Sequence, residues 1–205
     1  MSTAASYFDD MYRDSQDPWS LASRWYEQRK YDLTVAALPR PRYRSAFEPA
    51  CSVGELTARL AERCDAVLAC DRVASAVASA TRRTAGLPQV TVRQLTLPDQ
   101  WPEGTFDLIV LSELLYYFDT HDLTRLLDRT VEALEPDGTL VTVHWNHPVA
   151  EHARTGDDLA VVLADIPELA LLAHHREDDF VLQVFGRVHA DGGRPRSPAA
   201  DEGLV

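Results

Sequence analysis

The chain contains little cysteine and no long apolar segment, and each shortage excludes a class of protein. Its three cysteines, Cys51, Cys64 and Cys70, are an odd number without the spacing of a metal site. We expect them to be buried free thiols, which suit a reduced, cytoplasmic protein. No apolar run approaches the ~20 residues that cross a bilayer. The acidic N-terminal residues lack the basic start and apolar stretch of a signal peptide.

Basic residues are also scarce. The 205 residues include 20 lysines and arginines against 32 aspartates and glutamates, which gives a formal net charge of -12. Such a charge repels polyanions, so the sequence argues against nucleic acid or anionic membrane as a partner and favours a neutral or cationic small molecule. The length and the 45% apolar content suit one globular core.

Short apolar runs alternate with amphipathic stretches, which predicts an α/β fold. We expect a mainly parallel sheet with helices on both faces and an antiparallel hairpin at its end. The predicted strands are Ala46–Pro49, Ala66–Cys70, Val90–Leu95, Asp107–Leu111, Thr139–Trp145, Ala170–His175 and Phe180–Val188. The predicted helices are Leu21–Leu38 (with Leu21, Trp25 and Leu33 as its recurring apolar positions), Glu55–Cys64, Ala74–Thr84, Asp119–Leu134 and Gly156–Ala164. We divide the chain into an N-terminal helical cap (residues 1–40), a main domain (41–188) and a disordered tail (189–205).

Glycine is missing where a dinucleotide-binding turn would have it. The first predicted strand leads into the turn Phe47–Gly54, and the dinucleotide fold needs glycine at positions 50, 52 and 55. Those positions hold Ala50, Ser52 and Glu55, so the dinucleotide fingerprint fails. The small residues at 50, 52 and 54 still allow a sharp bend and the close approach of a nucleoside.

Two later strands also end in polar residues. Asp71 follows the second strand, where a carboxylate can accept hydrogen bonds from both hydroxyls of a ribose. It could instead cap the following helix, but the turn before it favours the ribose role. Ser112 and Glu113 end another strand at the carboxyl edge of the sheet, where open α/β folds bind ligands. Tyr116 and Tyr117 either line a pocket there or belong to the core.

Taken in order, these stretches resemble class I S-adenosylmethionine (SAM) dependent methyltransferases. The matching segments are Glu48–Thr57, Ala66–Asp71, Phe106–Tyr117 and Leu134–Leu140. More narrowly, Trp25–Lys30, Leu111–Tyr117 and His144–Pro148 resemble the NodS-like branch, the nodulation N-methyltransferases. The resemblance implies a Rossmann-like, seven-stranded sheet with a C-terminal antiparallel hairpin, and SAM as cofactor. It places the cofactor at Glu48, Ala50, Cys51, Ser52, Gly54, Asp71, Arg72, Leu95, Thr96, Leu97, Ser112, Glu113, Tyr26 and Arg29.

Three positions sharpen this expectation. Ala50 stands where the family usually has its first glycine, so cofactor binding should suffer if the φ angle at residue 50 is positive. Thr96 replaces an acidic residue that contacts adenine in many relatives, which leaves the adenine to the Leu95–Leu97 backbone and apolar packing. Arg29 could pair with the methionine carboxylate, although a solvated charge on a helix explains it equally well.

The resemblance implies methyl transfer to a small molecule, with an amine or amino sugar as the acceptor. An amine must be neutral to attack, so His144 and His147 are candidate bases, and each could instead be a loop residue or a cap. Glu113 is a candidate anchor for a cationic amine, and Tyr116 could line the methyl-transfer pocket. The alternatives are an O-methyltransferase of a natural-product pathway and a non-catalytic SAM-binding module. An NAD-dependent oxidoreductase is disfavoured by the missing glycines.

Overall fold

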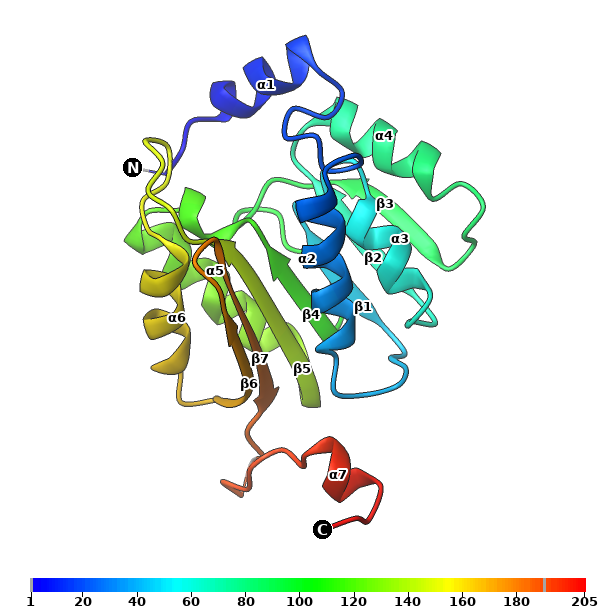
Figure 1. Cartoon of the computed structure of the whole chain (residues 1–205), viewed down its shortest axis with the longest axis vertical. Coiled ribbons are helices and arrows are strands. Elements are labelled where there is room, and N and C mark those ends of the chain that lie inside the picture. The colour runs from blue at the N-terminus through cyan, green and yellow to red at the C-terminus, as the bar shows by residue number, and fades with distance from the viewer. Residues whose placement is uncertain (1, 190) are drawn as a thin grey trace.

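A computed structural model describes residues 2–189 and 191–205, so Met1 of the predicted cap and Ala190 of the predicted tail lie outside the described residues. Seven strands form one sheet in the order β3-β2-β1-β4-β5-β7-β6 (Figure 1). Their bounds are β1 Ala46–Pro49, β2 Val67–Asp71, β3 Val90–Gln94, β4 Phe106–Ser112, β5 Leu134–Trp145, β6 Leu169–Arg176 and β7 Phe180–Arg187. Strands β1 to β5 pair in parallel, whereas β7 runs antiparallel to both β5 and β6. The predicted seven-stranded sheet with its terminal hairpin is confirmed.

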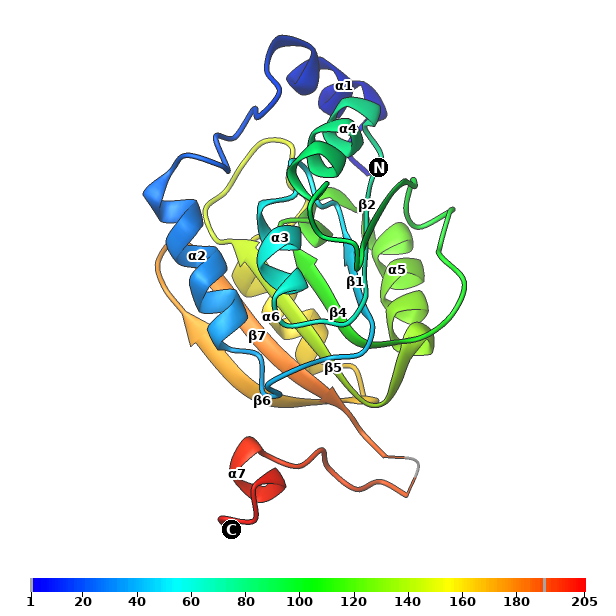
Figure 2. The ribbon, with the colours of Figure 1, turned by 90° about the vertical axis from the view of Figure 1, so that its right-hand side faces the viewer.

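Helices cover both faces of this sheet. They are α1 Ala5–Asp14, α2 Trp25–Ala36, α3 Glu55–Ala61, α4 Ala74–Arg83, the 3-10 helix η1 Leu115–Tyr117, α5 Thr120–Ala133, α6 Gly156–Ala164 and α7 Pro198–Asp201. Helices α2, α3 and α4 lie on one face, and α5 and α6 lie on the other (Figure 2). Consecutive residues of β1 therefore point into different cores. Ala46 faces α2 and α3, and Phe47 faces α5 and α6. Because both faces are covered, β4 is buried from Phe106 to Leu111, as parallel strands require.

The buried face of α2 differs from the predicted one. The sequence indicates Trp25 as one of its recurring apolar positions, but the Trp25 side chain is 76% exposed. The buried residues are instead Glu27, Lys30, Tyr31 and Thr34, which recur at helical spacing. The prediction was wrong because it followed apolar spacing alone. A polar face is buried here since its charged groups find partners at the carboxyl edge of the sheet.

Both terminal segments of the chain contain a helix. Helix α1, which lies in the predicted helical cap but for which the sequence analysis gave no bounds, crosses above the carboxyl edge of the sheet (Figure 1). Its Tyr12 packs among Phe8, Trp19, Val73 and Ala76. In the C-terminal segment the structure places the short helix α7, and Pro195 lies so close to Gly186 that a Cβ there would not fit. Among the described residues, no helix is long and apolar enough to span a membrane.

Candidate active site

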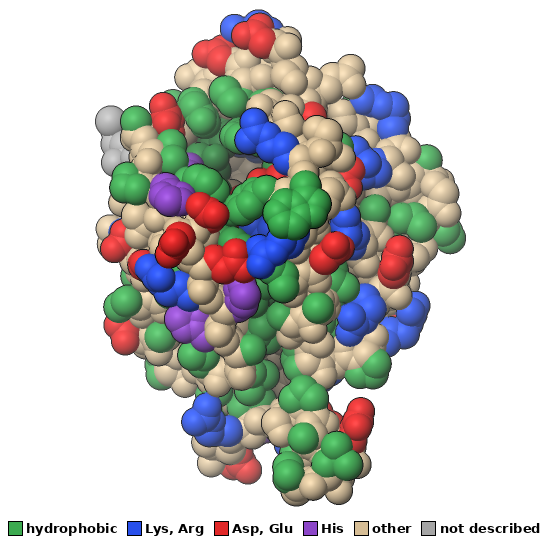
Figure 3. Space-filling view, viewed as in Figure 1, with side chains coloured by type: hydrophobic (Ala, Val, Ile, Leu, Met, Phe, Trp, Pro, Cys, Tyr) green, Lys and Arg blue, Asp and Glu red, His purple; other side chains and the backbone are tan. Residues whose placement is uncertain are grey.

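A cavity of about 520 Å³ opens at the carboxyl ends of β1, β2 and β4, beneath α1. Figure 3 shows the surface hollowed at this place, with apolar and charged side chains around the opening. β1 lies between β2 and β4, so the chain direction of the crossovers reverses there, and open α/β sheets bind ligands at such points. Most of the predicted cofactor residues line the cavity, namely Glu48, Ala50, Cys51, Ser52, Asp71, Arg72, Leu95, Thr96, Leu97, Ser112 and Glu113.

The turn after β1 is held in a left-handed conformation at three alternate residues. The φ angles are 58° at Ala50, 48° at Ser52 and 79° at Gly54. The first two are unusual for residues with a side chain, and strain of this kind accumulates at binding sites. Gly54 lies outside the cavity lining, and a Cβ there would come within 2.9 Å of the Ala80 backbone on α4. Gly54 therefore allows the bend and the packing of α4, whereas we expected it to give a ligand room.

Asp71 joins this turn to the end of β2. Its carboxylate accepts hydrogen bonds from the Ser52 N–H at 3.0 Å and the Val73 N–H at 2.9 Å. The cap residue of α4 is Val73, without a side-chain cap, so Asp71 does not cap the helix as the alternative reading proposed. Burial raises the pKa of Asp71, although these backbone hydrogen bonds act to lower it. Asp71 is thus a buried acceptor in the cavity wall, with lone pairs left for a ligand.

Glu48, at the end of β1, is the other acidic residue of this wall. It is 3% exposed, and its Oε2 has no hydrogen-bond partner among the described residues. Burial raises the pKa of Glu48 to about 8. A buried carboxyl oxygen without a partner is costly, and a cationic or hydrogen-bonding ligand in the cavity would remove that cost.

The backbone proposed to hold adenine is already partly used. The Leu95 N–H donates to the Asp71 carbonyl at 3.0 Å, and the Thr96 N–H donates to Gln100 Oε1 at 2.8 Å. The Thr96 carbonyl accepts from the Gln100 N–H at 2.9 Å. Recognition by this segment is therefore left to the Leu95 carbonyl, to Leu97 and to apolar contact.

Glu113 forms a charged cluster on the opposite side of the cavity. Its Oε1 lies 2.6 Å from Lys30 Nζ, and its Oε2 accepts from Tyr116 Oη at 2.5 Å and from the Trp145 N–H at 3.0 Å. Lys30 also pairs with Glu27 at 2.9 Å. Burial alone would raise the pKa of Glu113, but the Lys30 ammonium and its hydrogen bond lower it. Two carboxylates therefore surround one ammonium, which leaves the cluster with one negative charge.

The structure places neither predicted histidine base in the cavity lining. His144 is buried, and its Nε2 accepts a hydrogen bond from the Leu115 N–H at 3.3 Å. Burial lowers the pKa of His144 to about 4, so the ring is neutral and its acceptor atom is occupied. His147 is exposed and pairs with Asp179 at 2.7 Å. Both residues therefore fit the loop or structural role that was the alternative reading.

Two residues of α2 also lie outside the lining. Arg29 forms a two-point ion pair with Glu177, with N–O distances of 2.8 and 2.5 Å. The ring of Tyr26 packs edge-on against Trp145, 5.8 Å away between centroids. Two other arginines line the cavity, Arg72 and Arg24, and Arg24 lies just before α2. Within the described part of the chain, neither forms an ion pair with a carboxylate at contact distance, so the guanidinium of Arg24 is available to a ligand, five positions before Arg29.

Sequence reasoning missed a group of cavity residues from α1 and from the β5–α6 loop. Tyr12 on α1 hydrogen-bonds Ser52, and His152 stacks on Tyr116 with centroids 3.8 Å apart. The cavity lining also contains Arg24, Glu27 and Lys30, which the sequence analysis did not single out. The Glu27–Lys30 pair at i, i+3 gave no signal for a cavity, because such a pair stabilises a helix wherever it lies.

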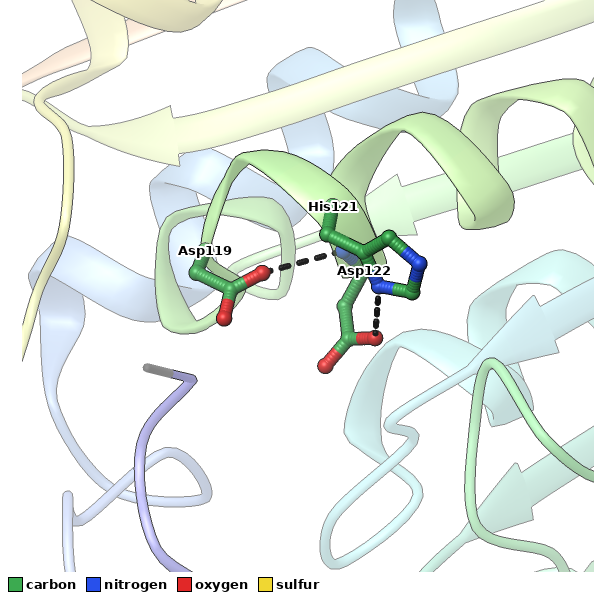
Figure 4. A group of neighbouring side chains, drawn as sticks. All are labelled: Asp119, His121 and Asp122. Carbon is green, nitrogen blue, oxygen red and sulfur yellow. Dashed lines mark hydrogen bonds and ion pairs between the residues drawn. The ribbon is translucent and has the colours of Figure 1, made fainter.

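A cluster of metal-ligand type lies at the start of α5. Asp119, His121 and Asp122 approach one another there (Figure 4). Asp119 accepts from the Asp122 N–H at 3.0 Å and so caps the helix. Asp122 accepts from Ser2 at 2.7 Å and from His121. Since protein donors already occupy these oxygens, we assign the cluster to helix capping and to docking of the N-terminal segment.

Comparison with known proteins places the chain in a family. The model of the family described as Nodulation protein S (NodS) matches residues 9–153. Nodulation protein S of Rhizobium tropici is 27% identical over 83% of this chain and 76% of its own length. The match spans about three fifths of the length of the Bradyrhizobium diazoefficiens Nodulation protein S, which is 29% identical, and half the length of a Deinococcus radiodurans trans-aconitate 2-methyltransferase that is 33% identical.

Solved structures agree. An inferred methyltransferase from Pseudomonas syringae is 48% identical, with a TM-score of 0.72 over 80% of this chain and 100% of its own. The N-methyltransferase NodS of Bradyrhizobium japonicum WM9, in complex with S-adenosylhomocysteine (SAH), has a TM-score of 0.79 at 21% identity, over 89% of this chain and 98% of its own. The fold, the cavity at the switch point of the sheet and these matches agree with one another. The chain belongs to the NodS family, and it is a class I SAM-dependent methyltransferase.

Proposed function

We propose that the enzyme methylates the nitrogen of a small amine-bearing acceptor, such as an amino sugar. The observation that carries this proposal is the net negative cluster of Glu27, Lys30 and Glu113 in the wall of the cofactor cavity. A desolvated negative wall favours a cationic or hydrogen-bond-donating amine. The relative from Bradyrhizobium japonicum WM9 is described as an N-methyltransferase, in line with this choice.

The cavity wall fits the cofactor at three points. In our proposal Asp71 accepts hydrogen bonds from the ribose hydroxyls, as acidic residues do at this position of nucleotide-binding folds. The buried Oε2 of Glu48 gains a partner in the amino group of the methionine part. Arg24 pairs with its carboxylate, a role for which a guanidinium is well suited. Arg29 is not used, because Glu177 already holds it.

When bound, the cofactor supplies an activated methyl group and its leaving group, so the protein supplies position and charge. The acceptor nitrogen must lie in line with the methyl carbon, and holding two reactants in this way can be worth ~7–11 kcal/mol. Glu113 is held by Lys30, Tyr116 and Trp145, so it faces the reacting groups in a fixed orientation. Aromatic rings of Tyr116, Tyr117 and Trp145 complete that side of the cavity and exclude water.

Calorimetry with SAH tests the cofactor part of the proposal. Asp71→Ala should weaken binding by ~1–3 kcal/mol, because it strands buried donors. Arg24→Gln should weaken binding at least tenfold, and Arg29→Gln should leave the dissociation constant unchanged. The reverse order for the two arginines would return the carboxylate role to Arg29.

A panel of acceptors tests the reaction. With SAM, the wild type should form SAH in the presence of primary amines such as glucosamine, and N-acetylglucosamine should give none. A second candidate is O-methylation of a carboxylate, because a trans-aconitate 2-methyltransferase is among the relatives. Turnover of trans-aconitate without turnover of amines would favour it. SAH binding without methylation of any acceptor would favour a non-catalytic SAM-binding module.

A further inference from the structure

We propose that His152 is the catalytic base of this enzyme. The inference rests on the proposed transfer to nitrogen and adds the residue that takes the proton. His152 is the one histidine that lines the cavity formed by the described part of the chain. It lies in the loop between β5 and α6, a place to which the sequence pattern does not draw attention.

The loop holds the imidazole in a fixed position. The Ala153 N–H donates to the Tyr116 carbonyl at 2.8 Å, and Thr3 Oγ1 donates to the Glu151 carbonyl at 2.6 Å. The ring stacks on Tyr116 with an interplanar angle of 16°, and it meets the edge of Tyr117 at 4.9 Å. Backbone bonds on both sides of His152 and two aromatic contacts therefore orient the ring against the wall that carries Glu113.

No hydrogen bond among residues 2–189 and 191–205 uses this ring. Its Nδ1 is buried without a partner, in contrast to His144, whose Nε2 already accepts from a backbone N–H. Within the described residues Nε2 has no partner either, and unlike Nδ1 it is not buried, so it is the nitrogen that a ligand in the cavity can reach. The accessible, unpartnered Nε2 and the position in the cavity together distinguish His152 from the other histidines.

The surroundings of His152 keep the ring neutral, so that it can accept a proton. Burial lowers its pKa, while the carboxylates of Glu113 and Glu151 oppose that effect. The other titratable groups around it are Tyr116 and Tyr117 of η1 and His144 of β5, and burial keeps all three neutral near pH 7. The imidazole is therefore neutral, and one of its nitrogens has a free lone pair.

The step can be written in full. The neutral imidazole accepts a hydrogen bond from an N–H of the acceptor and so turns the nitrogen lone pair toward the methyl carbon. The N–C bond forms as the C–S bond breaks, and the electron pair of that bond stays on the sulfur. The N–H proton moves to His152, which gains the positive charge that the sulfonium loses. Because His152 is only partly buried, the proton can then pass to solvent.

The test compares His152→Phe, which keeps a ring on Tyr116 but cannot accept a proton, with His174→Phe, a matched change at an exposed site on β6. Methyl transfer is measured as SAH formation with the amine that the wild type uses best. We expect His152→Phe to lower kcat at least 100-fold, the lower range for general base catalysis, with SAH affinity within twofold of wild type. His174→Phe should behave as wild type. His152→Gln provides a second variant should the phenylalanine fold poorly.

The dependence of kcat/KM on pH distinguishes a catalytic base from a residue with a structural role, because loss of a structural residue would not change the slope. At low pH the wild-type log kcat/KM should fall with a slope of two, one for the ionising amine and one for His152, whose pKa lies below 6.5. The His152→Phe slope should be one. Activity of His152→Phe within threefold of wild type, or an equal loss of SAH affinity, overturns the inference while the function stands. A wild type that methylates no amine overturns both.

Discussion

Ala50 has a methyl group at a position where the backbone favours glycine. Its φ of 58° costs an L-residue about 1–2 kcal/mol, and the residue is nevertheless part of the cofactor cavity. The sequence identifies Ala50 as the departure from the family pattern, but the sign of φ needed the structure. With φ positive, our sequence-based expectation is that the alanine weakens cofactor binding.

Ala50→Gly should therefore stabilise the protein by roughly 0.5–1 kcal/mol, after the extra chain entropy of glycine is subtracted. Urea unfolding measures the change, and SAH should bind at least as tightly as to wild type. The matched control is Ala58→Gly inside α3, where the backbone is helical and the same change should destabilise by ~0.5–1 kcal/mol. Destabilisation at both sites would mean that the left-handed turn at Ala50 carries no strain.

Glu48 couples cofactor binding to pH. Its pKa of about 8 means that most of the unliganded enzyme is protonated there at pH 7, while a cationic amino group beside it favours the carboxylate. Binding should then release a proton, so SAH affinity should rise with pH up to about 8 and level off above it. Calorimetry in buffers of different ionisation enthalpy measures the released proton. Glu48→Gln should release none, and equal release by the variant would exclude Glu48 as the source.

At the scale of elements, α2 is held against the sheet by a network of buried charged side chains. Lys30 is 2% exposed and lies between Glu27 and Glu113, so the helix is tied to the end of β4 by its charges. Lys30→Met should destabilise the protein by ~3–5 kcal/mol, because it leaves buried carboxylates without their cation. Arg29→Met, which breaks the more exposed pair with Glu177, should cost at most ~1 kcal/mol. Similar losses for the two variants in urea unfolding would contradict the structural importance of the Lys30 cluster.

The sequence predicts best those elements whose apolar pattern fits only one kind of secondary structure. Strand β4 and helix α5 lie within one or two residues of their predicted bounds, since a buried parallel strand and an amphipathic helix have distinct patterns. The bounds of helix α1 within the helical cap were not predicted, because Tyr7, Phe8 and Tyr12 line a cavity instead of extending the main core. His144 and His152 show the same limit at the site: His144 lies near the end of β5 and His152 in the loop after it, and only the fold shows which ring has a free nitrogen.

At the scale of the whole molecule, the binding site is shared by parts that are distant in sequence. Asp71 and Glu113 come from different strands, Lys30 from α2 and Tyr12 from α1, so the cavity exists only when the sheet and its covering helices are assembled. The hydrogen bond between Tyr12 and Ser52 closes α1 over the turn. A ligand that contacts all of these parts binds the folded state alone, which links its affinity to the stability of the entire domain.

Thermal unfolding tests that link. SAH at 100 times its dissociation constant should stabilise the fold by ~2.7 kcal/mol. For a chain of this length each kcal/mol raises Tm by about 2–4 °C, so Tm should rise by roughly 5–11 °C in a single transition. NADH should give no shift, because the glycines of the dinucleotide turn are absent. Two transitions, of which SAH moves one, would show that α1 and α2 unfold apart from the sheet and that the cavity is not a product of the whole fold.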